Sequence, residues 1–205
     1  RMKKYLFALM AFAVVLWLGF GAGVARATGP VNPGSDMFVT PGPASGPTAT
    51  HQDLTLPAAF FGPGSDPFVG TVYFVGAPLS GTNTIGADTI VERLLPLANV
   101  ACPGSDTIAI EIIALSLVSN DPITVTFNGG ATSSTYDVGA CLARSPTPQN
   151  LGTMVINHQC EEGGTFQSQL PVTARLTFTK VAGASGTPSA ELDPAPTMTF
   201  TGNGF

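Results

Sequence analysis

The apolar run from Pro103 to Phe127, PGSDTIAIEIIALSLVSNDPITVTF, constrains the fold more than any other part of the chain. Its first part is rich in β-branched side chains, which favour a strand over a helix. The core candidates in it are Ile108, Ile110, Ile112, Leu115, Leu117 and Val118. Residues 119–122, Ser-Asn-Asp-Pro, have turn chemistry, and Ile123, Val125 and Phe127 alternate after them. The pattern predicts a buried β-hairpin.

Other short segments of the same character follow one another along the chain, separated by Gly- and Pro-rich turns. Pro96 interrupts any helix near residues 89–100, and no amphipathic helix is evident after residue 27. Asn128-Gly129-Gly130 is a strong turn signal, with residues 134–138 as the returning strand. The sequence therefore predicts an all-β chain, an antiparallel β-sandwich of immunoglobulin-like or jelly-roll type. A closed β-barrel is the alternative.

The longest alternation in the chain runs from Phe166 to Phe178. Seven side chains face one side of it: Phe166, Ser168, Leu170, Val172, Ala174, Leu176 and Phe178. Polar residues occupy most of the positions between them, which is typical of a strand with one buried face. Pro171 lacks a backbone N–H, so it indicates a sheet edge or a bend at that point.

The beginning of the chain predicts export. Arg1, Lys3 and Lys4 form a basic region, an apolar run extends over residues 6–24, and residues 25–27, Ala-Arg-Ala, fit a cleavage site. We interpret residues 1–27 as a secretory signal peptide, and an uncleaved membrane anchor is the alternative. The expected location is secreted, extracellular or periplasmic, with no membrane association after cleavage.

Three further regions are expected after the signal peptide. Residues 28–53 form a Pro- and Gly-rich N-terminal segment in which only Met37-Phe38-Val39 could pair as a strand. Residues 54–182 form the β-sandwich domain. Residues 183–205 form a linker and a C-terminal strand at 197–201.

Charge excludes two classes of partner. Four of the eight basic residues lie in residues 1–27 and none of the thirteen acidic residues does, so the remaining chain carries 4 − 13 = −9. An acidic surface of this kind repels phosphate backbones and anionic lipid surfaces. Nucleic acid and membrane-surface functions are therefore not expected.

Three cysteines, Cys102, Cys141 and Cys160, would meet an oxidising environment after export. Cys141 and Cys160 flank a loop that carries Pro146 and Pro148, and we expect them to form a disulfide. Cys102 is then the unpaired cysteine.

The tetrapeptide Pro-Gly-Ser-Asp occurs three times, ending at Asp36, Asp66 and Asp106, and residues 86–90, Gly-Ala-Asp-Thr-Ile, echo the third copy. One interpretation is that each Asp side chain stabilises a turn by binding backbone N–H groups. The other is that the three carboxylates converge on Ca²⁺, although the dense acidic spacing of known calcium loops is missing. No other cofactor is expected.

No set of catalytic residues stands out. The chain has two histidines, His51 and His158, and no G-x-S-x-G motif for a nucleophile. Glu92 and Glu111 could form an acid pair for a glycosidase, but Glu111 fits the outer face of its strand. His158 and Cys160 are spaced to point the same way on a strand, yet a second pair of metal ligands is missing. We therefore predict a non-enzymatic protein.

Four phrases in the chain resemble those shared by a group of uncharacterised secreted bacterial proteins. They are AFFGPGSDPF at 59–68, DTIVERL at 88–94, ALSLVSNDPITVTFNGG at 114–130 and GGTFQSQLPVTARLTFT at 163–179. The resemblance spans most of residues 51–181 and implies a bacterial, exported protein with a single domain. It implies no activity and no catalytic residue.

The function expected from these features is a structural, adhesive or extracellular assembly role, with other copies or other surface components as partners. Residues 36–40 and 197–201 would pair with their own sheet or with a neighbour. The alternative is a carbohydrate- or calcium-binding module, for which Tyr73, Tyr136, Phe60 and Phe61 are the aromatic candidates. A hydrolase is a third and more remote alternative.

Overall fold

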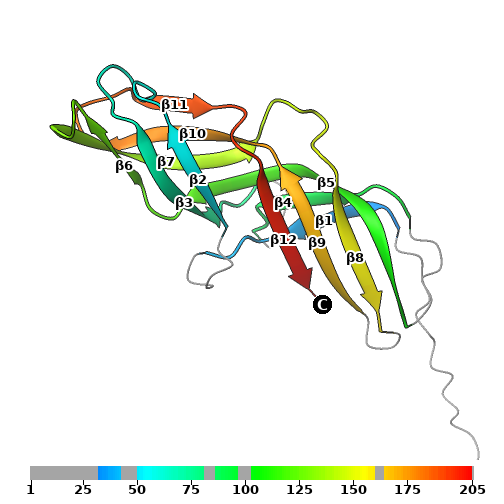
Figure 1. Ribbon diagram of the computed structural model, residues 1–205. Helices are drawn as coiled ribbons and strands as arrows, with labels where there is room; N and C mark the ends of the chain where they lie inside the picture. The colour runs from blue at the N-terminus through cyan, green and yellow to red at the C-terminus, as the bar shows by residue number, and fades with distance from the viewer. Residues whose placement is uncertain (1–31, 43–49, 81–85, 97–102, 160–163, 205) are drawn as a thin grey trace, which may run out of the picture.

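The computed structural model describes residues 32–42, 50–80, 86–96, 103–159 and 164–204. They form β1 (Gly34–Phe38), β2 (His51–Leu56), β3 (Phe68–Gly76), β4 (Thr89–Arg93), β5 (Gly104–Ser119), β6 (Ile123–Phe127), β7 (Thr132–Leu142), β8 (Gly152–His158), β9 (Gly164–Val172), β10 (Ala174–Ala182), β11 (Ser189–Leu192) and β12 (Met198–Gly204). Paired strands are antiparallel, and the sheet does not close on itself (Figure 1). The predicted antiparallel β-sandwich is confirmed, and the closed barrel is wrong.

The predicted signal peptide, residues 1–27, lies outside the described residues. In the ranges that are described, no helix has the length and apolar character needed to cross a membrane.

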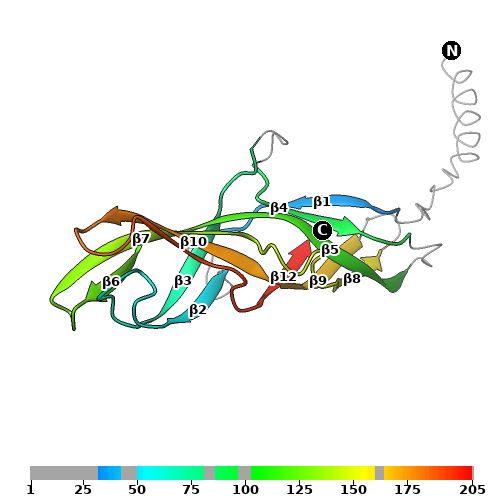
Figure 2. The same ribbon diagram turned by 90° about the horizontal axis from the view of Figure 1, so that it is seen from above.

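Strand β5 organises the molecule because its two ends belong to different groups of strands. Its first part pairs with β8 and its middle with β4, in a group ordered β1-β4-β5-β8-β9-β12. Its last residues pair with β3 and β7, in a group that also contains β2, β6, β10 and β11. We call these groups the first lobe and the second lobe. Figures 1 and 2 show the lobes end to end, with β5 extending through both.

A β-bulge at Ile113 allows β5 to serve both lobes. The register with β4 shifts here, because Ile90 lies opposite Ala114 while Val91 lies opposite Ile112. From Ile108 to the bulge the even-numbered side chains of β5 are buried, and after it the odd-numbered ones are buried. One extra residue moves the alternation of a strand by one position. The bulge therefore keeps apolar side chains in the core from Ile108 to Leu117, while Ile113 itself is 44% exposed.

The predicted hairpin between β5 and β6 is wrong. Both strands form, but each pairs with β7 instead of with the other. The β5 ladder ends beside Gly139, and the β6 ladder begins beside Tyr136. Residues 119–122 therefore do not reverse the chain but connect β5 to β6 along the same edge of β7. Between the two ladders the Val138 N–H donates to the hydroxyl of Ser119 at 2.9 Å. The chain reverses only at residues 128–130, where the Asn-Gly-Gly signal correctly predicted a turn.

The alternation from Phe166 to Phe178 is confirmed, and it is divided between β9 and β10 by Thr173. The apolar side chains at its even positions from Leu170 onward are buried. Pro171 lies just past the last residue of β9 that pairs with β8, so its missing N–H removes no bond of that ladder.

Two segments that the sequence indicated as linkers contribute strands to the same sheet network. β1 pairs with β4, and β11, which lies within residues 183–196, pairs with β10. Ala195 is buried as well. At the C-terminal end β12 pairs with β9, and the half-buried Phe38 and Phe200 pack against the core. Both terminal strands are therefore paired within their own chain.

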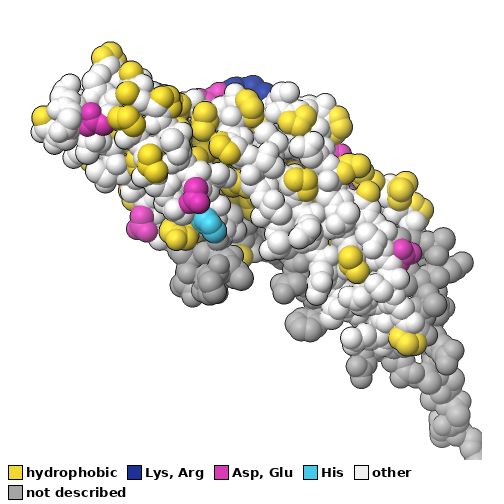
Figure 3. Space-filling view, viewed as in Figure 1, with side chains coloured by type: hydrophobic (Ala, Val, Ile, Leu, Met, Phe, Trp, Pro, Cys, Tyr) yellow, Lys and Arg dark blue, Asp and Glu magenta, His cyan; other side chains and the backbone are white. Residues whose placement is uncertain are grey.

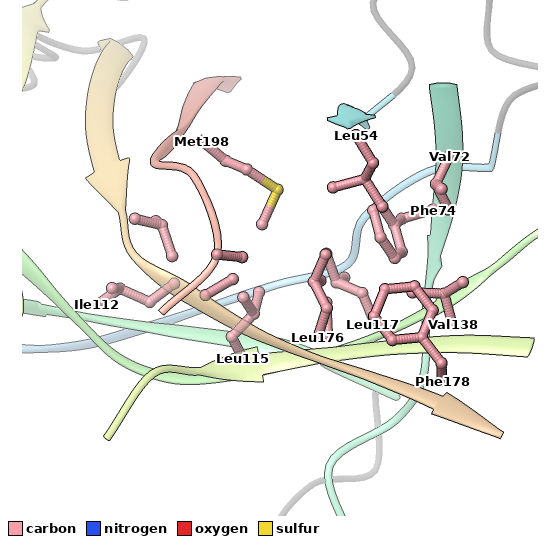
Figure 4. Close-up of a cluster of buried hydrophobic side chains, with 14 of the residues drawn as sticks. Leu54, Val72, Phe74, Ile112, Leu115, Leu117, Val138, Leu176, Phe178 and Met198 are labelled. Atoms are coloured by element: carbon pink, nitrogen blue, oxygen red, sulfur yellow. The ribbon is translucent and has the colours of Figure 1, made fainter. Parts of the chain in front are cut away.

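The core of the second lobe is formed by side chains from two facing layers. Leu54, Val72 and Phe74 from β2 and β3 face Leu117, Val138 and Phe178 from β5, β7 and β10 (Figure 4). An aromatic cluster continues this core, with ring centroids of Phe61 4.6 Å from Tyr136 and 5.3 Å from Phe178. Tyr136 and Phe61 are completely buried and Phe60 packs on Phe61 and Phe178, so these three are core residues and not a ligand platform.

Candidate functional site

Asp66 lies in the loop between β2 and β3 and holds the tip of the β6–β7 hairpin. Its two carboxylate oxygens accept the backbone N–H groups of Gly129 and Gly130, each at 3.0 Å. Both glycines have positive φ, which residues with a Cβ rarely adopt. The bond from Gly129 is the main reason that the pKa of Asp66 lies below its ordinary value, and the Thr126 side chain adds to the effect. Asp66 therefore stabilises a turn, although that turn is distant in sequence.

The other two repeated aspartates have separate partners. Asp36 on β1 forms an ion pair with Arg93, with 2.9 Å between Oδ2 and Nε. Asp106 on β5 accepts the N–H of the next residue, Thr107, at 2.7 Å. Among the described residues, no three His, Cys, Asp or Glu side chains are grouped as metal ligands. The structure does not bring the calcium candidates Asp36, Asp66 and Asp106 together.

Asp88 is a structural carboxylate whose importance the sequence analysis missed. It is completely buried, and its oxygens accept hydrogen bonds from Thr40 and from the Thr89 hydroxyl. Its backbone carbonyl accepts the Ser116 N–H at 2.8 Å. Asp88 thus connects the segment after β1 to β4 and β5 near the junction of the lobes. The echo of the Gly-Ser-Asp-Thr-Ile phrase at residues 86–90 was the available signal.

Glu92 and Glu111 lie directly opposite each other on β4 and β5, so their side chains share one side of the sheet. Glu111 already accepts the backbone N–H of Gln149 at 2.9 Å and so holds the loop after β7 in place. That bond gives Glu111 a structural role. The two histidines are far from this pair, since His51 is on β2 and His158 ends β8 opposite Gly104.

The two histidines lie in different surroundings on β2 and β8. The ring of His51 lies 5.7 Å from the ring of Tyr73 on the outer side of the β2–β3 hairpin. Tyr73 is 48% exposed, so of the four aromatic candidates it is the one that faces solvent. His158 has a buried Nε2 with no hydrogen-bond partner among the described residues. Its proposed companion Cys160 lies outside those residues.

Cys141 carries a free thiol, contrary to the disulfide with Cys160 that the sequence predicted. Cys141 lies opposite Ser116 on β5, whereas His158, two residues before Cys160, lies opposite Gly104. These positions on β5 are 116 − 104 = 12 residues apart, which is about 40 Å of extended strand. A disulfide needs Cα atoms within about 7 Å. The sulfur of Cys141 instead accepts two N–H groups of Arg175, at 3.2 and 3.1 Å.

Most strands at the margins of the described sheet are protected against pairing with another molecule. β11 has four residues between Pro188 and Pro194, and Arg144 binds its Glu191 and the nearby Asp193. The hydrogen bond between Arg144 and Glu191 raises the pKa of Arg144 and lowers the pKa of Glu191. The outer side of β6 is occupied by the β2–β3 loop, where the Asp66 N–H donates to the carbonyl of Thr126. Short length, charge and proline are the usual protections of an edge.

The other strands at the margins can be compared by the same three features, which are length, charge and proline. β1 has five residues and carries the Asp36–Arg93 ion pair, and β2 carries Asp53 and ends before Pro57. β12 is the exception in charge, because its seven residues, MTFTGNG, include no charged side chain, although Pro196 precedes the strand. β9 pairs with one side of it. We call the other side the β12 edge, and it is the candidate functional site.

Comparisons with protein-family models, with curated proteins and with solved structures gave no match.

Proposed function

We propose that this chain is an exported, non-enzymatic β-sandwich protein with a structural or adhesive role, and that its copies associate through the β12 edge. The observation that carries the proposal is the composition of β12, a margin strand of seven residues that lacks charge and proline. An unprotected strand edge presents a row of backbone N–H and C=O groups that another strand can pair with.

Two further features support association at this edge. Met198 is buried and Phe200 is half-buried against the core, so the strand is held in place before any partner arrives. A strand that is already ordered loses little conformational entropy on binding. The net charge of −9 expected after residue 27 makes copies repel each other. A contact region without charge is therefore the place where two copies meet at the lowest electrostatic cost.

The partner in this proposal is a second copy of the chain. Export follows from the interpretation of residues 1–27 as a signal peptide, and the non-enzymatic role is supported by the lack of a nucleophile motif in the sequence. Calcium binding receives no support from the separate partners of the three repeated aspartates.

Light scattering on the chain without residues 1–27 tests the proposal. We expect the average mass to rise with concentration, and Thr199→Lys with Thr201→Lys to abolish the rise, because lysines on an edge oppose strand addition. Both threonines are exposed, so the fold should tolerate the change. The matched control is Thr107→Lys with Thr153→Lys, which adds the same charge on exposed positions of β5 and β8.

Two results would contradict the proposal. A wild-type protein that stays monomeric at high concentration would exclude association and favour a ligand-binding module. Association that is lost in the β5–β8 control but kept in the β12 variant would place the contact on the face of the sheet.

A further inference from the structure

The outer face of the first lobe carries an array of neutral polar side chains. It consists of the odd-numbered residues at 105–109 on β5, 153–157 on β8 and 165–169 on β9, together with Thr201 on β12. The strand register places them in rows, one of which is Ala109, Thr153, Gln169 and Thr201. All of these residues except Ala109 and Val155 have a hydroxyl or carboxamide side chain. We call this array the neutral face.

The neutral face is one side of a sheet whose other side is core. Ile108, Met154 and Leu170, at neighbouring even positions, are buried. On the neutral face Thr107, Thr153 and Gln169 are exposed. The surface over β9 and β12 is mainly white in Figure 3, the colour of backbone and uncharged polar side chains. These side chains are therefore available to a partner on a surface that is continuous across four strands.

Most charged side chains are found elsewhere, and the nearest on this side of the sheet are Glu92 and Glu111, beyond Ala109. The second lobe carries the group formed by Arg144, Arg175, Glu191 and Asp193, and its hairpin tip carries Asp66. None of the acidic residues that the structure describes belongs to the array itself. A partner that binds there meets neither attraction nor repulsion from a charge within the array, whereas an anionic polymer is repelled by the molecule as a whole.

We propose that the neutral face binds an uncharged polysaccharide. Hydroxyl and carboxamide groups both donate and accept hydrogen bonds, as the hydroxyl groups of sugars do. The rows cross strands that lie about 4.8 Å apart, so a polymer chain lying along a row meets a polar group at most of the strands. Each such bond is weak in water, at about 1 kcal/mol. An extended partner that makes many of them is therefore a better match than a small sugar.

This proposal does not depend on assembly, because the neutral face consists of side chains and the β12 edge of backbone groups, and only Thr201 contributes to both. Pairing at the edge leaves the face uncovered and continues its rows into the next copy. Several copies on one polymer chain would bind with a higher effective concentration than one copy alone. The two proposals therefore fail separately.

Co-sedimentation with insoluble polysaccharides tests the inference. The neutral probes are cellulose, chitin and a β-1,3-glucan, the acidic probe is cross-linked alginate, and a tube without polymer corrects for self-association. We expect the chain without residues 1–27 to sediment with at least one neutral probe and not with alginate. Binding should persist in high salt, because screening acts on charges and the face has none.

The decisive variant is Gln167→Glu with Gln169→Glu, which changes exposed residues without changing their shape. We expect it to weaken binding at least tenfold, because the buried charges would lose hydration without gaining a partner. The matched control, Thr124→Glu with Ser133→Glu, adds the same charge at exposed positions of β6 and β7 and should bind as the wild type does.

Three results would overturn the inference. They are a lack of binding to every neutral probe, equal binding by the face variant and the wild type, and equal loss of binding in the face variant and the control. In addition, if light scattering without polymer shows association that only the face variant loses, the face binds a second copy and the polysaccharide assignment is wrong.

Discussion

Asp88 and Thr40 are joined by two hydrogen bonds across 48 residues of sequence. The backbone N–H of Thr40 donates to Oδ2 at 2.6 Å, and its hydroxyl donates to Oδ1 at 2.7 Å. Gly76 borders the same carboxylate, and a Cβ at that position would overlap with Oδ2. The buried carboxylate thus adds to the backbone hydrogen bonds from Asp88 to Phe38 and from Gly76 to Thr40, where the segment after β1 passes the end of β3 and the start of β4.

We therefore expect Asp88→Ala to lower the free energy of unfolding by about 2–4 kcal/mol, because it leaves buried N–H and hydroxyl groups without an acceptor. Gly76→Ala should also destabilise the fold, since its methyl group displaces the carboxylate. Urea unfolding measures both effects. Asp121→Ala, at an exposed position bound to the Asn120 side chain, is the control and should change stability by less than about 0.5 kcal/mol. An Asp88→Ala protein as stable as this control would remove the structural role.

The lowered pKa of Asp66 predicts that part of the free energy of unfolding depends on pH. Its folded-state pKa is lowered from 3.8, so the unfolded chain holds the proton more tightly than the folded one. The contribution is therefore complete above the unfolded pKa and disappears as the pH falls through the folded pKa. We expect Asp66→Asn to melt at a lower temperature than wild type near neutral pH, and the difference to shrink below about pH 4. A difference that is constant over this range would contradict the assignment.

The same melts test the calcium alternative. Because the oxygens of Asp66 already accept two backbone N–H groups, wild-type melts with excess Ca²⁺ and with a chelator should coincide. A ligand that binds the folded state must raise the melting temperature. A rise of several degrees in calcium that Asp66→Ala abolishes would favour a binding module.

The register of β5 and β8 predicts a disulfide that differs from the one expected at first. Cys102 and Cys160 lie outside the described residues, but each is two positions beyond the pair Gly104 and His158. Residues opposite each other on antiparallel strands have Cα atoms about 4.5–5.5 Å apart, which suits a disulfide. We expect non-reducing peptide mapping to join Cys102 to Cys160 and to find Cys141 as a free thiol. A peptide joining Cys141 to either one would contradict the register argument.

Alternation and turn chemistry were sufficient to predict the fold class. Two local signals are confirmed, the alternation from Phe166 to Phe178 and the turn at residues 128–130. Alternation follows directly from burial of one strand face in the core, and the turn residues follow from the twist of the two strands that they join. The buried positions of β5 were also mostly predicted, because a long run of apolar β-branched residues is stable only when most of its side chains are buried in the core.

The incorrect predictions concern pairing between distant segments. Residues 119–122 have the composition of a reversal, yet β7 accepts both flanking strands on one edge, and only that pairing distinguishes an offset from a hairpin. β11 and β1 lie in Pro- and Gly-rich sequence whose local preference is weak, and their partners β10 and β4 determine their structure. Asp88 was missed for the same reason, since its main partner Thr40 is distant in sequence.

Hydrogen exchange of the backbone amides of β12 at low and high protein concentration tests the central claim most directly. The N–H groups on the β12 edge have no strand beyond them among the described residues, so they should exchange rapidly in a dilute sample. We predict that concentration slows exchange in residues 198–204 and leaves β11, which is held by Arg144, unchanged. Exchange in β12 that is equally fast at both concentrations, in a sample that scatters as an oligomer, would contradict assembly through this edge.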